Sequence, residues 1–195
     1  MEKRMGLRIS PVVAGMLVVM MLSDRSGLCA LTLLAALLHE CGHLLAAKAL
    51  GIPLGQLRID FLGARMEVVG RMLSYGEEWM LCAAGPLTSL LLAAAAAPLW
   101  QPFAHAQMFS CASLVLGTLN LLPIRTFDGG RMLESALSAC CGARTVRRIL
   151  RLSSFFFLFL LWASAVYFLL RVGDGLSLLA FSMSLFFRFF DGERI

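Results

Sequence analysis

Two histidines and a glutamate within five consecutive residues are the side chains of this sequence best suited to chemistry. His39 and His43 are four residues apart, so on a helix they project from one face and can bind one metal ion. Glu40 lies between them, where its carboxylate can accept a proton from a water molecule. Two imidazoles and one further protein ligand leave a fourth zinc position open for that water. The motif therefore predicts Zn2+ as cofactor and a hydrolytic reaction.

The surroundings of this motif strengthen the prediction. A three-residue motif arises by chance in about 2% of chains of this length. Here it lies in the apolar run 28–50, and an ionisable group near a bilayer centre costs about 2.5–3.5 kcal/mol and usually has a function. The chain has only three histidines, and the third, His105, falls in an expected outer loop where it is simply solvated. The alternative of satisfied core histidines stays open.

The composition is that of a membrane protein. Hydrophobic residues make up 59% of the chain and charged residues 15%, against about 45–50% and about 25% in soluble domains. We expect about six transmembrane helices, because apolar runs of about 20 residues can cross a bilayer. The first run is interpreted as a retained span and not as a cleaved signal peptide. The six expected spans lie near 9–22, 28–50, 77–97, 104–122, 152–170 and 175–190.

The basic residues predict the orientation of these spans. With a cytoplasmic N-terminus, the inside segments hold 15 of the 17 lysines and arginines, and only Arg25 and Arg171 fall outside. The positive-inside rule then predicts an even number of spans with both termini in the cytoplasm. The net charge of +5 is explained by this topology, so we expect no binding to nucleic acid.

Two segments between the expected spans have patterns of their own. Residues 57–61 and 65–68 alternate apolar and polar side chains around Gly63, which predicts a small membrane-associated β-hairpin between the second and third spans. Backbone at membrane depth needs partners from protein or a water-filled cavity, although an ordinary polar surface hairpin stays open. Residues 129–151 predict a short helix and a basic stretch bordering the membrane.

Asp128 is the best candidate for a third metal ligand. It follows the fourth expected span in the run NLLPIRTFDGG, and it precedes Gly129 and Gly130, which allow close backbone approach. Apart from Glu40, the other acidic residues fall in tails, outer loops, helix starts or the hairpin, or, as Glu134, on the interfacial helix after Asp128. A simpler role for Asp128, as the N-cap of a helix, stays open.

Three segments resemble the site-2 protease family of intramembrane zinc metalloproteases, peptidase family M50. They are LLHECGHLLAA, AAGPLTSLL with Gly85 and Pro86, and NLLPIRTFDGG with Asn120, Pro123 and Asp128, in the order found in that family. Together they run from about residue 35 to 131.

This resemblance implies roles for individual residues. His39, His43 and Asp128 would bind zinc, Glu40 would be the catalytic acid and base, and Asn120 would help to hold the substrate backbone. The hairpin would receive the substrate as an added strand. Among the departures from the family pattern, Arg125-Thr126 stands where prolines are frequent, and Ser89 stands where Asn is common.

Motifs in the second and fourth of six spans resemble the sporulation branch of the family, which cleaves a membrane-associated sigma-factor precursor. We therefore expect a bacterial multi-pass cell-membrane protein without a CBS or PDZ domain. The expected fold is all-α and polytopic, with the hairpin, in a single domain over 1–195 whose core is 28–131 and whose additional helices fill 132–195.

The expected function is hydrolysis of a peptide bond in or next to a transmembrane segment of a membrane-associated substrate, near the cytoplasmic face. The partners would be that substrate, the lipid bilayer and a regulatory membrane protein in trans. The alternatives are a metal-binding membrane transporter or sensor, and a catalytically inactive scaffold.

Overall fold

The computed structural model describes residues 7–9, 11–60, 63–68, 71–101, 103–172 and 176–191. The chain divides into two compact units, Met1–Asn120 and Leu121–Ile195. The predicted single domain over 1–195 stays a prediction, and its core at 28–131 extends past the boundary between the two units. Both chain ends, and with them the predicted cytoplasmic termini, lie outside the described residues.

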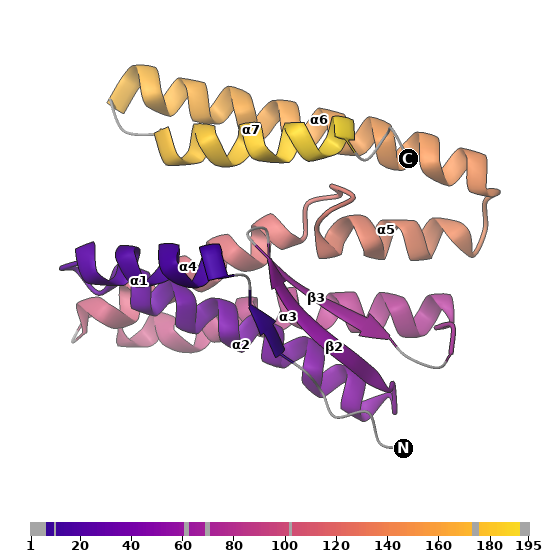
Figure 1. Cartoon of the computed structure of the whole chain (residues 1–195), viewed down its shortest axis with the longest axis horizontal. Helices are drawn as coiled ribbons and strands as arrows, with labels where there is room; N and C mark the ends of the chain where they lie inside the picture. The colour runs from indigo at the N-terminus through magenta and orange to yellow at the C-terminus, as the bar shows by residue number, and fades with distance from the viewer. Residues whose placement is uncertain are drawn as a thin grey trace. The chain divides into compact units, whose positions relative to one another are not determined.

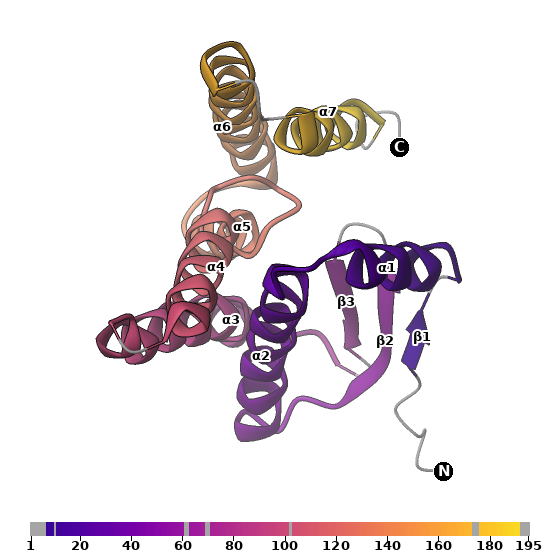
Figure 2. The same cartoon turned by 90° about the vertical axis from the view of Figure 1, so that its left-hand side faces the viewer.

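The first unit combines helices with a small sheet (Figures 1 and 2). Its elements, in chain order, are β1 (Leu7–Ile9), α1 (Pro11–Ser23), α2 (Leu28–Ala49), β2 (Leu54–Asp60), β3 (Gly63–Val68), α3 (Tyr75–Ala96), the 3-10 turn η1 (Ala97–Leu99) and α4 (Ala104–Asn120). Helices α2, α3 and α4 pack against one another pairwise. The second unit holds α5 (Asp128–Ser138), α6 (Ala143–Val172) and α7 (Leu176–Asp191). Within it, α6 packs against both α5 and α7.

The strands form a three-stranded sheet with β2 in the middle, as Figure 2 shows. β2 pairs antiparallel with β3, and Arg58 lies opposite Arg65. On its other side β2 pairs parallel with β1, where Leu57 is the partner of Leu7. Residues 61 and 62, between β2 and β3, lie outside the described part of the chain.

The predicted fold class, an all-α protein with about six spans and one two-stranded hairpin, is wrong. The described residues contain seven α-helices, and three segments are long and apolar enough to cross a membrane: Leu28–Ala49, Tyr75–Leu99 and Ala143–Arg171. The other apolar runs form shorter helices, with 13 residues in α1, 17 in α4 and 16 in α7. At about 1.5 Å per residue these are shorter than a hydrocarbon core of about 30 Å. The first run also begins inside β1, which pairs in the sheet.

The helices of the first unit turn small and polar residues inward and large apolar residues outward. On α2 the buried residues are Ala35, His39, Gly42, His43 and Ala47. The leucines of the same helix point the other way, with Leu34 46% exposed, Leu37 60% and Leu45 67%. Water disfavours such an outer surface, whereas lipid is as apolar as leucine. This is the arrangement of a membrane protein.

The end of α2 is fixed by local sequence. Gly51 adopts a positive φ of 63°, which glycine accepts without a steric penalty. Its N–H donates to Lys48 O at 3.2 Å, and the Ile52 N–H donates to Ala47 O at 2.8 Å. This is a Schellman motif. It buries Ile52 against Ala47 and Leu81 and so joins the end of α2 to α3.

Candidate metal centre

His39 and His43 lie on the inward face of α2, where every fourth residue from Ala35 to Ala47 is buried. The two imidazoles are 4% and 7% exposed, respectively. Burying a polar ring in an apolar environment is unfavourable unless its nitrogens find partners. Both rings find them on α3, which packs along this face.

Each histidine uses its δ nitrogen for a hydrogen bond to α3. His43 Nδ1 lies 2.8 Å from the Leu81 carbonyl oxygen, and His39 Nδ1 lies 2.9 Å from the buried hydroxyl of Ser89. A carbonyl oxygen can only accept, so His43 Nδ1 carries the proton. The neutral imidazole therefore keeps a lone pair on Nε2. These bonds fix both ring orientations, as partners of metal-binding histidines do.

The two ε nitrogens face each other at 3.3 Å. Two nitrogens bound to one tetrahedral zinc ion at about 2.0–2.1 Å would be separated by about 3.3–3.4 Å. The separation therefore fits zinc without any movement of the rings.

Gly85 of α3 leaves room beside both ε nitrogens. A β-carbon at this position would lie 2.7 Å from His39 Nε2 and closer still to His43 Nε2. Any other residue would therefore push against both rings at their ε nitrogens. Gly85 thus has a steric role in the site, besides beginning the Gly-Pro pair seen in the sequence.

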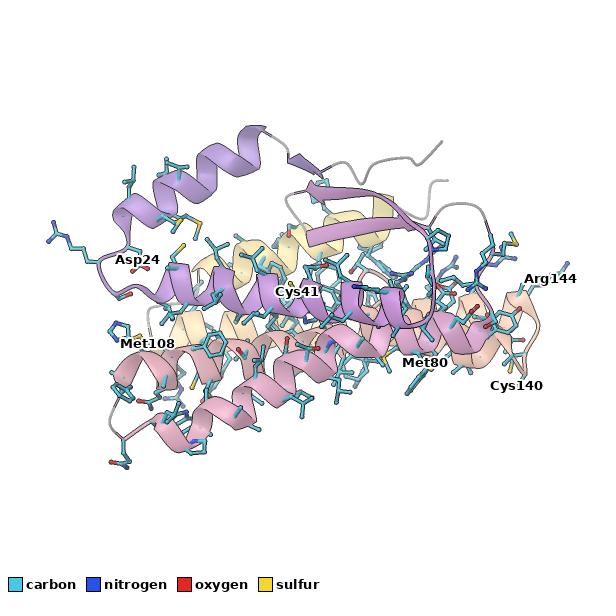
Figure 3. All side chains as sticks on the ribbon, turned by 90° about the horizontal axis from the view of Figure 1, so that it is seen from below. Asp24, Cys41, Met80, Met108, Cys140 and Arg144 are labelled. Carbon is cyan, nitrogen blue, oxygen red and sulfur yellow. The ribbon has the colours of Figure 1, made fainter. Side chains whose placement is uncertain are left out.

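Glu40 follows His39 on α2 and is half-buried. One residue turns an α-helix by about 100°, so Glu40 projects beside the histidine face and not along it. The next residue, Cys41, is exposed on the outer side of the helix (Figure 3). Glu40 thus lies at the edge of the buried histidine pair, where its carboxylate can contact both the imidazoles and an incoming molecule.

Asn120 is the last residue of α4 and is half-buried. Its Nδ2 donates to the Leu116 carbonyl oxygen, one turn earlier, at 3.0 Å. One amide hydrogen is therefore bound to the residue's own helix, and the side-chain oxygen is a further hydrogen-bond acceptor.

Asp128 begins α5 as its first helical residue. The N-cap is Phe127, in extended conformation with φ −102° and ψ 164°, so Asp128 does not serve as the N-cap. The alternative role that the sequence left open is therefore not the one observed. A carboxylate in the first turn is favoured by the positive end of the helix dipole.

The loop before Asp128 is clamped from two sides within the second unit. On one side a β-carbon at Gly129 would lie 2.7 Å from the Leu122 carbonyl oxygen and closer still to that of Leu121. On the other side the Ser153 hydroxyl donates to Pro123 O at 3.0 Å, and the Arg125 N–H donates to Ser154 Oγ at 3.0 Å. These contacts therefore fix the backbone that carries Asp128 without using the Asp128 side chain.

The sequence prediction missed several residues that support this centre. Ser89 was noted only as a departure from a common Asn, and the Leu81 carbonyl and the Ser153–Ser154 pair carried no signal. One pattern could have indicated Ser89, because it follows Gly85 by four residues and so lies on the same face of α3. A small residue and a hydroxyl on one face of a spanning helix indicate close packing against a polar partner.

Comparison with known proteins finds similarity to one family of peptidases. The family described as Peptidase family M50 matches residues 97–164, a segment that contains Asn120 and Asp128. A protein named as the zinc metalloprotease Rip3, from two strains of Mycobacterium tuberculosis, is 30% identical over 119 residues, which are 55% of this chain and 30% of that protein. The chain is thus similar to members of peptidase family M50 over part of its length. It spans about a third of the length of these curated relatives.

The fold resembles that of one solved structure. A site-2 protease from Methanocaldococcus jannaschii superposes with a TM-score of 0.62 at 22% identity, covering 100% of this chain and 94% of that structure. The two buried imidazoles of α2 offer two nitrogen donors, and histidine nitrogens are typical ligands of catalytic zinc. Zinc is therefore the cofactor that these residues fit.

Proposed function

We propose that this chain is an intramembrane zinc metalloprotease. The observation that carries the proposal is the pair of ε nitrogens at 3.3 Å, buried on the inward face of a span and each oriented through its δ nitrogen. A pair that only stabilised the fold would need no adjacent carboxylate, whereas hydrolysis needs the base that Glu40 provides.

We infer that Asp128 is the third protein ligand. Its support comes from its place in the M50 motif, and from a backbone held by Gly129 on one side and by Ser153 and Ser154 on the other. When bound, zinc lowers the pKa of water and polarises a peptide carbonyl as a Lewis acid.

Glu40 has two proton transfers to perform. Its carboxylate accepts a proton from water as the water oxygen attacks the carbonyl carbon of the peptide bond. As the C–N bond breaks, Glu40 returns that proton to the leaving nitrogen, and the products are a carboxylic acid and an amine. His39 and His43 keep fixed orientations throughout, because Ser89 and Leu81 hold their δ nitrogens.

The proposed substrate is a membrane-associated protein, cut in or next to a transmembrane segment. A helical substrate hides its carbonyls in its own hydrogen bonds, so it must unwind before water can attack. Asn120 supports this step if its Nδ2 exchanges the Leu116 carbonyl for a carbonyl of the unwound substrate. The Lys and Arg distribution further supports a site toward the cytoplasmic face, with both termini in the cytoplasm. A sigma-factor precursor as substrate and a regulator in trans stay predictions.

The substitution Glu40→Gln tests the function directly. The wild-type chain and the variant are expressed in the membranes of a bacterial host, and new N-termini of membrane proteins are quantified. We expect these cleavage products to disappear in Glu40→Gln, while zinc per purified chain stays at the wild-type value.

The matched variant His43→Ala loses both the zinc and the products, and so separates metal binding from proton transfer. Unchanged product formation by Glu40→Gln would contradict the proposed chemistry. Unchanged zinc in His43→Ala would instead contradict the metal site.

A further inference from the structure

Three exposed arginines mark the start of α6. Arg144, Arg147 and Arg148 lie within its first two turns, and all three are exposed. At about 100° per residue their side chains project within an arc of about 100° on one side of the helix. Arg144 extends away from the ribbon in Figure 3. We name these three residues the arginine face.

The positive charge of the arginine face is not neutralised within the described part of the second unit. Residues 121–172 contain seven arginines and two acidic residues, Asp128 and Glu134, both on α5. None of the three arginines has an acidic partner among the residues that the structure describes. The first turn of α6 contains no acidic residue, so the positive end of its dipole adds to the repulsion. An anion bound here would relieve both effects.

The arginine face continues directly into an apolar surface. From Arg148, steps of four, three and four residues lead to Leu152, Phe155 and Phe159, which are 62%, 47% and 48% exposed. Such steps keep side chains on one side of a helix. An anion held by the arginines therefore has large apolar side chains beside it, about 6 Å further along the helix axis.

The length of α6 sets the depth of these groups in a bilayer. Residues 152–170 are uninterrupted by charge and span about 28 Å, close to a hydrocarbon thickness of about 30 Å. When this stretch crosses the hydrocarbon, the arginine face lies at the level of the lipid phosphates.

We propose that Arg144, Arg147 and Arg148 form a binding site for the phosphate groups of anionic phospholipids. The acyl chains of such a lipid lie along Leu152, Phe155 and Phe159. Clusters of basic residues next to a span attract anionic lipid by about 1 kcal/mol per residue. The apolar row favours a lipid over a free phosphate or an acidic peptide, because neither of these has chains to cover it. The site is independent of the proposed protease activity.

The test uses the full chain in nanodiscs of phosphatidylcholine containing a small fraction of phosphatidylglycerol. The relative association of spin-labelled phosphatidylglycerol and phosphatidylcholine is measured by electron paramagnetic resonance. We expect the wild type to prefer phosphatidylglycerol, and the triple variant R144Q/R147Q/R148Q to lose this preference by about fivefold for each arginine removed. Because all three side chains are exposed and their mutual repulsion is removed, the thermal unfolding midpoint in pure phosphatidylcholine should not fall.

Two matched variants make the result specific. R144K/R147K/R148K keeps the charge and should keep most of the preference, and Arg171→Gln, at the other end of α6, should keep all of it. An undiminished preference in the triple glutamine variant would overturn the proposal. So would displacement of the lipid by soluble glycerophosphate at equal concentration, which would indicate a free phosphate site. Arginine-dependent binding of an oligoglutamate peptide in place of the lipid would overturn it as well.

Discussion

The histidine pair and Asp128 are both positioned by close packing around glycine, but different kinds of structure do the packing. His39 and His43 project from a regular helix, and a second helix supplies Gly85 together with the partners of both δ nitrogens. Asp128 follows an irregular loop, which is clamped between Gly129 and Gly130 on one side and the serines of α6 on the other.

This difference separates two ways of building a site. In the helical region α2 and α3 approach closely at Gly42 and Gly85, and hydrogen bonds from α3 hold the two imidazole rings. In the loop region the backbone is held in place, and this fixed backbone sets the position of the Asp128 side chain. Substitutions in the first region should therefore change zinc binding more than folding, and substitutions in the second should change folding and zinc binding together.

The largest effect is expected from Gly85→Ala. A β-carbon there overlaps both imidazole ε nitrogens, so the rings must rotate away from the geometry that fits zinc. We expect the purified variant to contain less than about a tenth of the wild-type zinc, because ring orientation sets metal affinity. Elemental analysis of the purified chain measures this.

Gly76→Ala is the matched control on the same helix, because a β-carbon at Gly76 meets nothing within 4 Å. Zinc should be unchanged in this variant, and the stability of α3 should change little, because Gly76 lies in the first turn of the helix. Wild-type zinc in Gly85→Ala would show that the histidines do not bind the metal through these nitrogens.

Gly130→Ala tests the loop region. A β-carbon here would lie 2.8 Å from Arg125 N and closer still to the Ile124 carbonyl oxygen. These are backbone atoms of a loop that Ser154 holds from the other side, so they cannot shift cheaply. We expect a loss of about 3 kcal/mol in the free energy of unfolding, with zinc lost in parallel.

Gly142→Ala is the control in the same unit, since nothing lies within 4 Å of a β-carbon there. Denaturant unfolding in detergent compares the two variants. A Gly130→Ala chain as stable as Gly142→Ala would refute the clamped loop.

The same contrast explains what the sequence could predict. The four-residue spacing of His39 and His43 is a helical pattern, and the structure places the two rings together. The hydrogen bonds of Ser89 and Leu81 come from a helix about 40–50 residues further along the chain, and no local pattern encodes how two helices are rotated against each other.

The fold prediction failed for a related reason. The prediction treated each long apolar run as one transmembrane span. However, α1, α4 and α7 are shorter than a regular helix that crosses the bilayer hydrocarbon. The pairing of β1 with β2 joins residues 50 positions apart, and three residues leave too short a pattern to indicate a strand. A run that looks like one span can therefore hold a strand and a short helix.

Ser89→Ala tests whether the hydrogen bond to His39 Nδ1 contributes to zinc affinity. It removes the partner of His39 Nδ1 at 2.9 Å without adding bulk. Loss of such an orienting partner lowers metal affinity by about 10–100-fold, so we expect a shift of this size in competition with a zinc chelator. Substitution with Co2+ gives a second measure, since its visible spectrum reports ligand geometry.

Ser113→Ala is the control, because Ser113 is equally buried and its hydroxyl has no hydrogen-bond partner in the described structure. Removing an unsatisfied hydroxyl should be neutral or stabilising. Equal chelator curves for the two serine variants would show that Ser89 only fills space.

The smallest expected effect concerns the start of α2, where Figure 3 shows Asp24, about three turns before the histidines. The Ser26 hydroxyl donates to Asp24 Oδ1 at 2.6 Å, and the Cys29 N–H in the first turn donates to Asp24 Oδ2 at 2.6 Å. These bonds lower the pKa of Asp24 from its ordinary value, the Ser26 hydroxyl most strongly. A carboxylate whose pKa is lower in the folded state stabilises the fold fully above its ordinary pKa of about 3.9, and this contribution is lost as the pH falls further.

The variant Asp24→Asn isolates this contribution, since Asn can still accept one hydrogen bond at the helix start but does not titrate. At neutral pH the wild type should have the higher unfolding midpoint, and between about pH 5 and pH 3 its midpoint should fall more steeply than that of Asp24→Asn, so that the two curves converge. The comparison must use the difference between the two curves, because other carboxylates titrate in the same range. Parallel curves over this range would show that the start of α2 does not depend on the Asp24 charge. Zinc content should stay the same in both proteins at neutral pH, because the histidines are held by contacts with α3 and not by the end of their own helix.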